Sequence, residues 1–176
     1  HTSVDSGKRL TFFDHLPKMK KVDFTSEVDG DKSLHPSILQ LGSMYRVGLI
    51  QEDDDRVASL LVAFCNVIRD YMTPPNKSLN WDLDKYIRNQ VQYLVDCRPL
   101  CVGMGNLIKQ LRHFISQSPP DANEANAKAL IVNKLHSFFE DRMQYAMESI
   151  GNLVADVIHH DDVILTYGSS PLMRKT

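Results

Sequence analysis

The chain has 176 residues, of which 43% are apolar and 24% are charged, and its formal net charge is −2 at pH 7. This length allows one globular domain with a sizeable core, and the near-neutral charge excludes a general affinity for nucleic acid or anionic membranes. Three cysteines form an odd and sparse set, which excludes a secreted disulfide framework and favours free thiols in a reducing compartment.

Neither a membrane span nor a signal peptide is visible along the chain. No apolar run reaches the roughly 18 residues that a membrane span needs, and residues 1–30 lack the apolar centre of a signal peptide. We therefore expect a cytosolic protein without membrane contact. Because the first residue is His1 rather than Met, we expect a fragment or a processed form.

The N-terminal segment, residues 1–33, contains basic residues, Asp, Gly and Ser, and one short apolar cluster, LTFFDHLP. This pattern predicts a partly ordered arm that docks through Phe12, Phe13 and Leu16. Its charge is typical of a solvated tail, and an acidic partner is the second interpretation.

Two helices are predicted next. The first begins at His35, with Pro36 in a first turn where its missing N–H costs nothing, and its apolar stripe runs to Leu49. The second begins in EDDD, residues 52–55, because carboxylates are favourable at a helix N-terminus, and it stops before Pro74. Its broad apolar run predicts burial on most sides.

The third predicted helix follows SLNWDLDKYIRNQVQYLVDC, whose Leu, Ile and Val residues form one stripe. The fourth follows RPLCVGMGNLIKQLRHFISQ, with Pro99 at its start and Leu107, Leu111 and Phe114 on one side. Both helices are therefore expected to be amphipathic and to pack against a common core.

The stretch SPPDANE is the clearest turn, because Asp121 and Glu124 have the spacing of a capping box. A long fifth helix is predicted to leave it, with an apolar stripe from Leu130 to Ile158. Only then does a β signal appear, DVILTYGSS, at residues 162–170. The predicted order is thus about five helices followed by one strand.

The stretch DCRPLCVGMGNLIKQL, residues 96–111, suggests more than one kind of site. Gly103 and Gly105 lack the third glycine and the preceding strand of a dinucleotide fingerprint, so close packing of backbones is the favoured interpretation. Cys97 and Cys101 lack the second pair of ligands that a structural zinc site requires, and inert packed thiols are favoured.

Two acidic motifs are weaker candidates for a metal. In HHDD, residues 159–162, neighbouring side chains on a helix point in different directions, and the favoured interpretation is His in a last helical turn with Asp in the following turn. The EDDD motif lacks the alternating ligands and glycine of a calcium loop. No metal, cofactor or catalytic residue is predicted.

Five motifs, FFDHLP, LHPSILQLGSMYRVG, VIRDYMTPP, DCRPLCVGMGNLIKQL and DVILTYGSS, occur in the order and at about the spacing found in one family. From Phe12 to Ser170 the chain resembles the delta subunits of eukaryotic translation initiation factor 2B. The resemblance implies a mainly α chain: a helical domain, residues 34–160, and the first strand of a Rossmann-like α/β domain, truncated within residues 161–176. Such a strand would leave an unpaired edge.

The same resemblance implies a function. The family's factor exchanges guanine nucleotide on initiation factor 2, and its delta subunit belongs to a regulatory core with the beta and alpha subunits. That core senses the phosphorylated alpha chain of initiation factor 2, whereas the exchange catalyst is another subunit. The chain is therefore expected to be a cytosolic, non-catalytic module that binds proteins, without a cofactor and without direct nucleic-acid contact.

The resemblance also implies partner-binding residues. Asp141, Arg142 and Tyr145 match positions that face the phosphorylated alpha chain, and Leu41 matches a position near the contact between delta and beta subunits. From the local pattern alone, the first three would be a solvated helix face, and Leu41 would be a core residue.

The superfamily includes sugar-phosphate isomerases of the methylthioribose-1-phosphate type, which supply the catalytic alternative. Their Arg-Pro-Thr motif is similar to Arg98-Pro99-Leu100, so Arg98 is a candidate anion site or a structural ion pair with an acid such as Asp96, and the ion pair is favoured. Their acid–base cysteine falls at Gly168, and a hydrogen atom cannot replace a thiol. A generic helical interaction domain is the remaining alternative.

Overall fold

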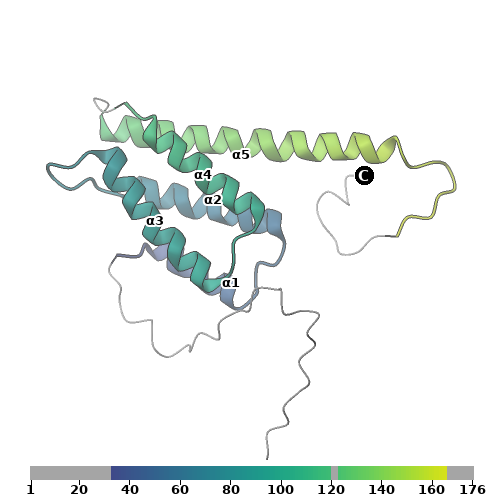
Figure 1. Ribbon diagram of the computed structural model, residues 1–176, viewed down its shortest axis with the longest axis horizontal. Coiled ribbons are helices and arrows are strands. Elements are labelled where there is room, and N and C mark those ends of the chain that lie inside the picture. Colours follow the sequence, from purple (N-terminus) through teal and green to yellow (C-terminus); the bar gives the residue numbers. More distant parts are fainter. Residues whose placement is uncertain (1–32, 120–122, 166–176) are drawn as a thin grey trace, which may run out of the picture. The chain divides into compact units, whose positions relative to one another are not determined.

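The computed structural model describes residues 33–119 and 123–165. Over these residues the chain is helical and contains no strand, which confirms the predicted mainly α fold class with five helices. The helices, shown in Figure 1, are α1 (Pro36–Arg46), α2 (Asp53–Asp70), α3 (Leu79–Cys97), α4 (Val102–Ser116) and α5 (Glu124–Ala155).

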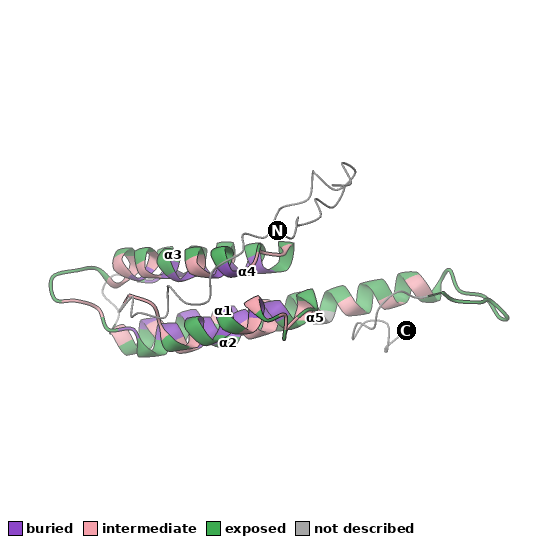
Figure 2. Ribbon diagram, turned by 90° about the horizontal axis from the view of Figure 1, so that it is seen from below, coloured by how far each residue is buried: buried purple, intermediate pink, exposed green. Residues whose placement is uncertain are grey.

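The helices enclose one core. α1 packs against α2 and α3, α4 packs against α2 and α3, and α5 packs against α2 and α4. Figure 2 shows the buried residues on the facing sides of these helices. The core cluster consists of Ile38, Leu41, Tyr45, Val57, Leu60, Leu61, Ala63, Phe64, Cys65, Val67, Ile68, Tyr71, Leu83, Ile87, Leu94, Met104, Leu107, Ile108, Leu111, Ile115, Ile131, Val132 and Leu135.

α1 begins as predicted and ends earlier than predicted. Pro36 is its first residue, and the His35 ring accepts a hydrogen bond from the Ser37 N–H at 3.2 Å. Gly48 adopts φ 69°, a left-handed conformation that suits glycine, and the Leu49 N–H then donates back to the Met44 carbonyl at 3.0 Å. The prediction that the stripe continues to Leu49 is therefore wrong, and this side chain is 69% exposed.

The loop between α3 and α4 also differs from the prediction. α4 begins at Val102 with Cys101 as its N-cap, so Pro99 precedes the helix and does not lie in its first turn. The residue before a proline is held away from the helical region, and Arg98 is extended at φ −160° and ψ 136°. Pro99 thus ends α3 rather than starting α4.

α5 begins at Glu124, and the Asn123 side chain caps it by accepting the Ala125 N–H at 3.0 Å. The predicted cap, Asp121, lies outside the described residues. Near the start of α5, Val132 and Leu135 are buried, as the predicted stripe requires. Further along, Ile150 is 40% exposed and Leu153 is 64% exposed, because no described element covers this end of the helix. Figure 2 shows this change from buried to exposed.

Gln90 is a polar residue in the middle of the core, with no exposed surface. Its side-chain oxygen accepts the His35 N–H at 2.9 Å, and its amide nitrogen donates to the Ser33 carbonyl at 2.8 Å. A buried amide must find such partners, since an unsatisfied one costs about 1–3 kcal/mol. Gln90 of α3 therefore fixes the segment that leads into α1.

The predictions for the two ends of the chain concern residues of which the structure describes only a part. The arm with Phe12, Phe13 and Leu16 lies outside the described residues. Of the predicted strand, residues 162–165 are described; they are not a strand, and Val163 is 98% exposed. A strand needs a neighbour for its hydrogen bonds, and the described residues offer none. The boundary at residues 160 and 161 stays a prediction. None of the described helices is long and apolar enough to cross a membrane.

Candidate functional site

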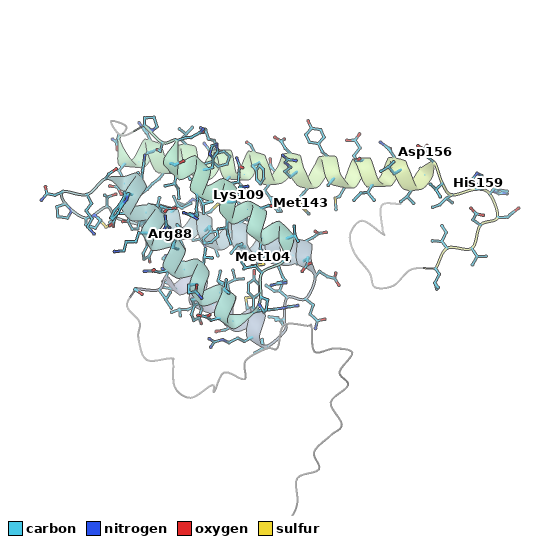
Figure 3. All side chains as sticks on the ribbon, viewed as in Figure 1. Arg88, Met104, Lys109, Met143, Asp156 and His159 are labelled. Atoms are coloured by element: carbon cyan, nitrogen blue, oxygen red, sulfur yellow. The ribbon has the colours of Figure 1, made fainter. Side chains whose placement is uncertain are left out.

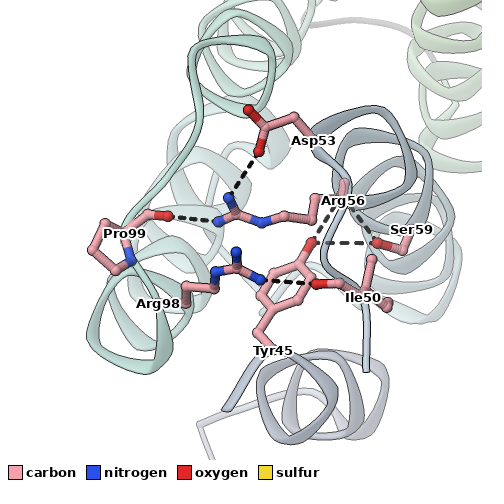
Figure 4. Close-up of polar contacts among 7 residues, drawn as sticks. All are labelled: Tyr45, Ile50, Asp53, Arg56, Ser59, Arg98 and Pro99. Atoms are coloured by element: carbon pink, nitrogen blue, oxygen red, sulfur yellow. Dashed lines mark hydrogen bonds and ion pairs between the residues drawn. The ribbon is translucent and has the colours of Figure 1, made fainter. Parts of the chain in front are cut away.

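Two arginines connect the helix ends on one side of the core (Figure 4). Arg56 of α2, which is 4% exposed, donates to Asp53 Oδ1 at 3.1 Å and to the Pro99 carbonyl at 2.5 Å. Arg98 donates to the Ile50 carbonyl at 2.9 Å. We call Arg56 and Arg98, with the carbonyls of Pro99 and Ile50, the arginine clasp. It joins α2 to the α3–α4 loop and joins that loop to the α1–α2 loop.

Tyr45 supports the arginine clasp from α1. Its hydroxyl donates to the Arg56 carbonyl at 2.8 Å and lies 3.3 Å from Ser59 Oγ. The Arg56 guanidinium carbon lies 5.3 Å from the centroid of the Tyr45 ring, which is within cation–π range. Burial raises the pKa of Tyr45, outweighing the opposite effects of Ser59 and of the two clasp arginines. The phenol is therefore a neutral donor inside this network.

Arg98 has a structural partner that the sequence did not indicate. The predicted acid, Asp96, instead accepts a hydrogen bond from Gln92 Nε2 at 3.1 Å. The contacts of the described residues do not include a pair between Arg98 and Asp96, and the guanidinium is directed to the Ile50 carbonyl (Figure 4). Anion binding by Arg98 stays a prediction.

The two glycines of α4 have different roles. A Cβ added at Gly103 would lie 2.8 Å from Val57 Cγ2, so the absence of a side chain lets α4 approach α2. A Cβ added at Gly105 would meet nothing within 4 Å. Close packing is thus confirmed at Gly103, although the neighbouring atom belongs to the Val57 side chain rather than to a backbone. The same prediction is wrong at Gly105, which faces open space.

The cysteines are free thiols. Cys97 is 4% exposed and lies beneath Gly42 of α1, where a Cβ would come within 2.8 Å of its Sγ. Burial raises the pKa of Cys97, although Arg46 and Tyr93 act in the opposite direction. Cys97 is therefore packed as predicted, whereas Cys101, for which the same was predicted, is only half-buried. The low reactivity of the two thiols stays a prediction.

The HHDD motif lies beyond the end of α5, so the prediction that its His residues occupy a last helical turn is wrong. Asp161 has φ 72°, a left-handed conformation that Asp tolerates better than most residues. The His159 N–H donates to Asp162 Oδ2 at 2.7 Å, and the His160 side chain is 99% exposed. Within residues 33–119 and 123–165, no three His, Cys, Asp or Glu side chains are grouped so as to hold a metal.

The predicted partner-binding residues occupy two different settings. Asp141, Arg142 and Tyr145 are exposed on α5, and Arg142 lines a hollow together with residues of α2 and α4 such as Asp54 and Gly103. Tyr145 is 69% exposed, and the Arg142 guanidinium lies 5.6 Å from the centroid of the Phe138 ring. Leu41 is 4% exposed and belongs to the core, at the base of a hollow between α1 and α2. The structure does not bring Leu41 together with the other three.

Two important residues were missed by sequence reasoning. Gln90 follows Leu83 and Ile87 in the same apolar register of α3, and a polar residue at such a position signals a buried hydrogen-bonding role. Arg56 follows three aspartates, so the run resembled a solvated helix start. No local signal distinguishes it, because its acceptor on Pro99 is 43 residues away.

The comparisons with known proteins agree with the sequence motifs. The sequence model of the initiation factor 2 subunit family matches residues 50–176. Translation initiation factor eIF2B subunit delta of Dictyostelium discoideum is 31% identical over 176 residues, covering 97% of this chain and 28% of that protein. The delta subunit of Schizosaccharomyces pombe is 34% identical over 160 residues, covering 91% of this chain and 34% of that protein.

Solved structures give the same result. The crystal structure of eIF2B delta from Chaetomium thermophilum has a TM-score of 0.74 and 30% identity, and the match covers 82% of this chain and 53% of that one. The tetrameric eIF2B beta2–delta2 complex from C. thermophilum gives 0.72 and 29%, covering 81% of this chain and 46% of that one. The chain spans about a third of the length of these curated relatives and about half of these solved chains.

The described residues form a helical domain. In it, Arg56 and Arg98 connect α2, the α1–α2 loop and the α3–α4 loop. The chain belongs to the initiation factor 2 subunit family. The resemblance to delta subunits of translation initiation factor 2B, which the five motifs indicated, is confirmed.

Proposed function

We propose that this chain is the helical, regulatory part of a delta-type subunit of translation initiation factor 2B. In this role it binds the beta and alpha subunits of the exchange complex and senses the phosphorylated alpha chain of initiation factor 2. The observation that carries the proposal is the match to delta subunits over nearly the whole chain, including one solved in a beta2–delta2 complex. The free thiols support a cytosolic location, which fractionation of cells tests.

A surface on α5 supports the sensing role. Asp141 and Tyr145 are one helical turn apart and share a side of the helix, and Arg142 is three residues from Tyr145. All three are exposed, and an exposed tyrosine beside charges is typical of a residue that anchors a protein contact. Because the three side chains are exposed, a partner reaches them without displacing core residues.

The hollow between α1 and α2 supports the contact with a beta subunit. Leu41 lies at its base, and Val62, which is 57% exposed, lies at its side. A partner side chain that enters this hollow reaches Leu41 although that residue is nearly covered. Leu41→Ala removes core contacts as well, so Val62→Asp is the sharper test, because it places a charge on the exposed side of the hollow.

A calorimetric titration tests the sensing role. The chain is titrated with the alpha chain of initiation factor 2, phosphorylated and unphosphorylated in parallel. We expect the phosphorylated form to bind more tightly and Asp141→Ala and Tyr145→Ala to reduce that difference. Glu140→Ala, which removes an exposed carboxylate from another side of the same helix, is expected to leave it unchanged. Equal binding of both forms rejects sensing by this chain alone.

Co-purification tests the assembly role. A tagged beta-type subunit is expected to retain the chain and to lose Val62→Asp, while the control Glu140→Ala is retained. Retention of Val62→Asp at the level of the unmodified chain rejects the hollow as the contact site.

We propose that the chain acts without catalysis and without a cofactor. Arg98, which matches the anion-contacting arginine of the related isomerases, donates to the Ile50 carbonyl. The position of their acid–base cysteine is Gly168, which cannot transfer a proton through its side chain. Turnover of methylthioribose-1-phosphate by the chain would overturn this proposal in favour of the isomerase alternative.

A further inference from the structure

A cleft with cationic walls lies between α3 and α4, apart from the arginine clasp and from the exposed surface on α5. It has a volume of about 680 Å³. Arg88 contributes from α3 and Lys109, Arg112 and His113 from α4, and Trp81 lines the same cleft near the start of α3. Figure 3 shows that Arg88 and Lys109 come from these two neighbouring helices.

One carboxylate organises the cleft. Asp84 Oδ2 accepts Arg88 Nε at 2.9 Å and Arg88 Nη2 at 2.5 Å, and Asp84 Oδ1 accepts Arg112 Nε at 2.7 Å. The Asp84 side chain is 18% exposed, whereas the Arg88 and Arg112 side chains are 62% and 44% exposed. Asp84 therefore holds two guanidinium groups side by side while leaving much of each open to solvent.

The charge balance of the cleft is positive. Arg88, Arg112 and Lys109 are basic residues, and Asp84 is the only carboxylate among the residues that line the described cleft. Guanidinium groups have five N–H donors in a planar fork, so each arginine keeps donors for a second oxyanion after it binds Asp84. The arrangement suits the carboxylate or phosphate oxygens of a ligand.

Trp81 adds an apolar wall. Its side chain is 73% exposed, although a residue of this size is usually largely covered. An exposed indole beside cations offers a flat surface for an aromatic or aliphatic side chain next to an anionic one. The cleft therefore combines anion recognition with one apolar contact.

The exposure of the lining side chains indicates which kind of ligand the cleft binds. Small-molecule sites bury about 70–90% of their ligand, and a cleft in which Arg88 and Trp81 are mostly exposed does not enclose one to that degree. A polypeptide segment needs no such enclosure. Nucleic acid is disfavoured because its phosphates extend far beyond this local patch and would meet a chain of net charge −2.

We propose that the α3–α4 cleft binds an acidic polypeptide segment in which carboxylate or phosphoserine residues flank an aromatic or aliphatic residue. Arg88, Arg112 and Lys109 bind the anionic groups, Trp81 packs on the apolar residue, and Asp84 positions the two arginines. This proposal goes beyond the assembly and sensing roles, which use residues of α1, α2 and α5.

The chain carries its own reporter, because Trp81 is its only tryptophan. Tryptophan emission of the 176-residue chain is followed during titration with the peptide Glu-Glu-Phe-Glu-Glu, and with a version carrying phosphoserine in place of two glutamates. Gln-Gln-Phe-Gln-Gln and a single-stranded oligonucleotide serve as comparison ligands. Sodium chloride is added to match ionic strength, because screening alone weakens surface electrostatics.

We expect both anionic peptides to change the Trp81 emission saturably, with the neutral peptide without effect. Arg88→Gln and Lys109→Gln are expected to weaken binding about tenfold, the loss of one charge-assisted contact. Lys85→Gln, the same charge change on α3 outside the cleft, is expected to leave binding within about twofold. Circular dichroism of each variant checks that the helices are intact.

Three outcomes overturn the proposal. One is binding of the neutral peptide as tightly as the acidic one, which shows a purely apolar contact. Another is an equal loss in Lys85→Gln and Arg88→Gln, which shows unspecific attraction to overall charge. The third is saturable binding of the oligonucleotide alone, which assigns the cleft to nucleic acid. Calorimetry with Trp81→Ala, expected to weaken the acidic peptide without abolishing it, separates the apolar contact from the ionic ones.

Discussion

Gly42 of α1 packs closely against side chains of α3, and its replacement by alanine gives a sharp test of the packing. A Cβ at this position would lie 2.4 Å from Tyr93 Cε1 and 2.8 Å from Cys97 Sγ. Both distances are shorter than real Cβ atoms accept, so the Tyr93 and Cys97 side chains, or the helices that carry them, must shift. Gly105 provides a matched control, because its Cβ would meet nothing within 4 Å.

The magnitude follows from two opposing effects. Alanine is favoured over glycine inside a helix by about 1 kcal/mol, whereas overpacking a core costs about 1–3 kcal/mol. Two contacts below 3.0 Å at Gly42 place the cost near the upper end, so Gly42→Ala is expected to lose about 1–2 kcal/mol net. At roughly 2–4 °C per kcal/mol for a chain of this size, Tm falls by about 2–8 °C. Gly105→Ala is expected to gain about 0.5–1 kcal/mol.

Thermal unfolding followed by circular dichroism measures both variants. Adding Cys97→Ala to Gly42→Ala removes the Sγ contact, so the double variant is expected to be more stable than the sum of the single effects by about 0.5 kcal/mol or more. A Gly42→Ala chain that melts at or above the temperature of Gly105→Ala would refute the close approach of α1 to α3.

Three further measurements test the charged and titratable groups. Arg56→Met keeps an unbranched stem but removes the bonds to the part-buried Pro99 carbonyl and to Asp53, so the free energy of unfolding in urea is expected to fall by about 0.5–1.5 kcal/mol; an unchanged free energy of unfolding would contradict the role of the arginine clasp. Burial raises the pKa of Cys65 and Cys97, so a thiol-reactive dye is expected to label half-buried Cys101 first in the folded chain and all three after denaturation; equal rates before unfolding would refute this order. Although partial burial alone would raise it, hydrogen bonds from the two neighbouring arginines hold the pKa of Asp84 below 3.8. The ionised Asp84 therefore stabilises the folded chain at neutral pH, and this stabilisation is lost as pH falls through the pKa of the folded state. The free energy of unfolding of Asp84→Asn should be lower than that of the unmodified chain at neutral pH, and the difference should shrink below about pH 4. A difference that stays constant with pH would contradict the stabilising role of the Asp84 charge.

The helices were predictable because their signals are local. Pro36 at the start of α1, the aspartates at the start of α2 and the apolar stripe of α3 act within one or two turns, and each element formed where these signals placed it. The errors came from residues whose conformation depends on distant partners or on a single dihedral angle. Gly48 ends α1 through its positive φ, and Pro99 belongs to a loop that Arg56 holds from 43 residues away.

The candidate sites were harder to predict than the helices. Arg98 was predicted to bind an anion or to pair with an acid, but its acceptor in the structure is a backbone carbonyl, and no side-chain pattern reveals a carbonyl. The α3–α4 cleft was missed entirely, since Asp84 and Arg112 are 28 residues apart and become neighbours only when α4 folds back along α3. The residues on α5 were indicated by family resemblance, and the structure adds their exposure.

The arginine clasp has an uneven tolerance to substitution. Its donors are two particular side chains, whereas its acceptors are the main-chain carbonyls of Ile50 and Pro99. Every amino acid supplies a carbonyl, so the identity of residue 50 does not matter to the hydrogen bond as long as the backbone path is kept. Arg56 and Arg98 have no such freedom, because lysine lacks the planar fork and reach of a guanidinium. In a mutational scan each of these two hydrogen bonds should therefore be lost when its arginine is replaced, and the bond to residue 50 should be kept when that residue is replaced, although the Ile50 side chain also packs against the core.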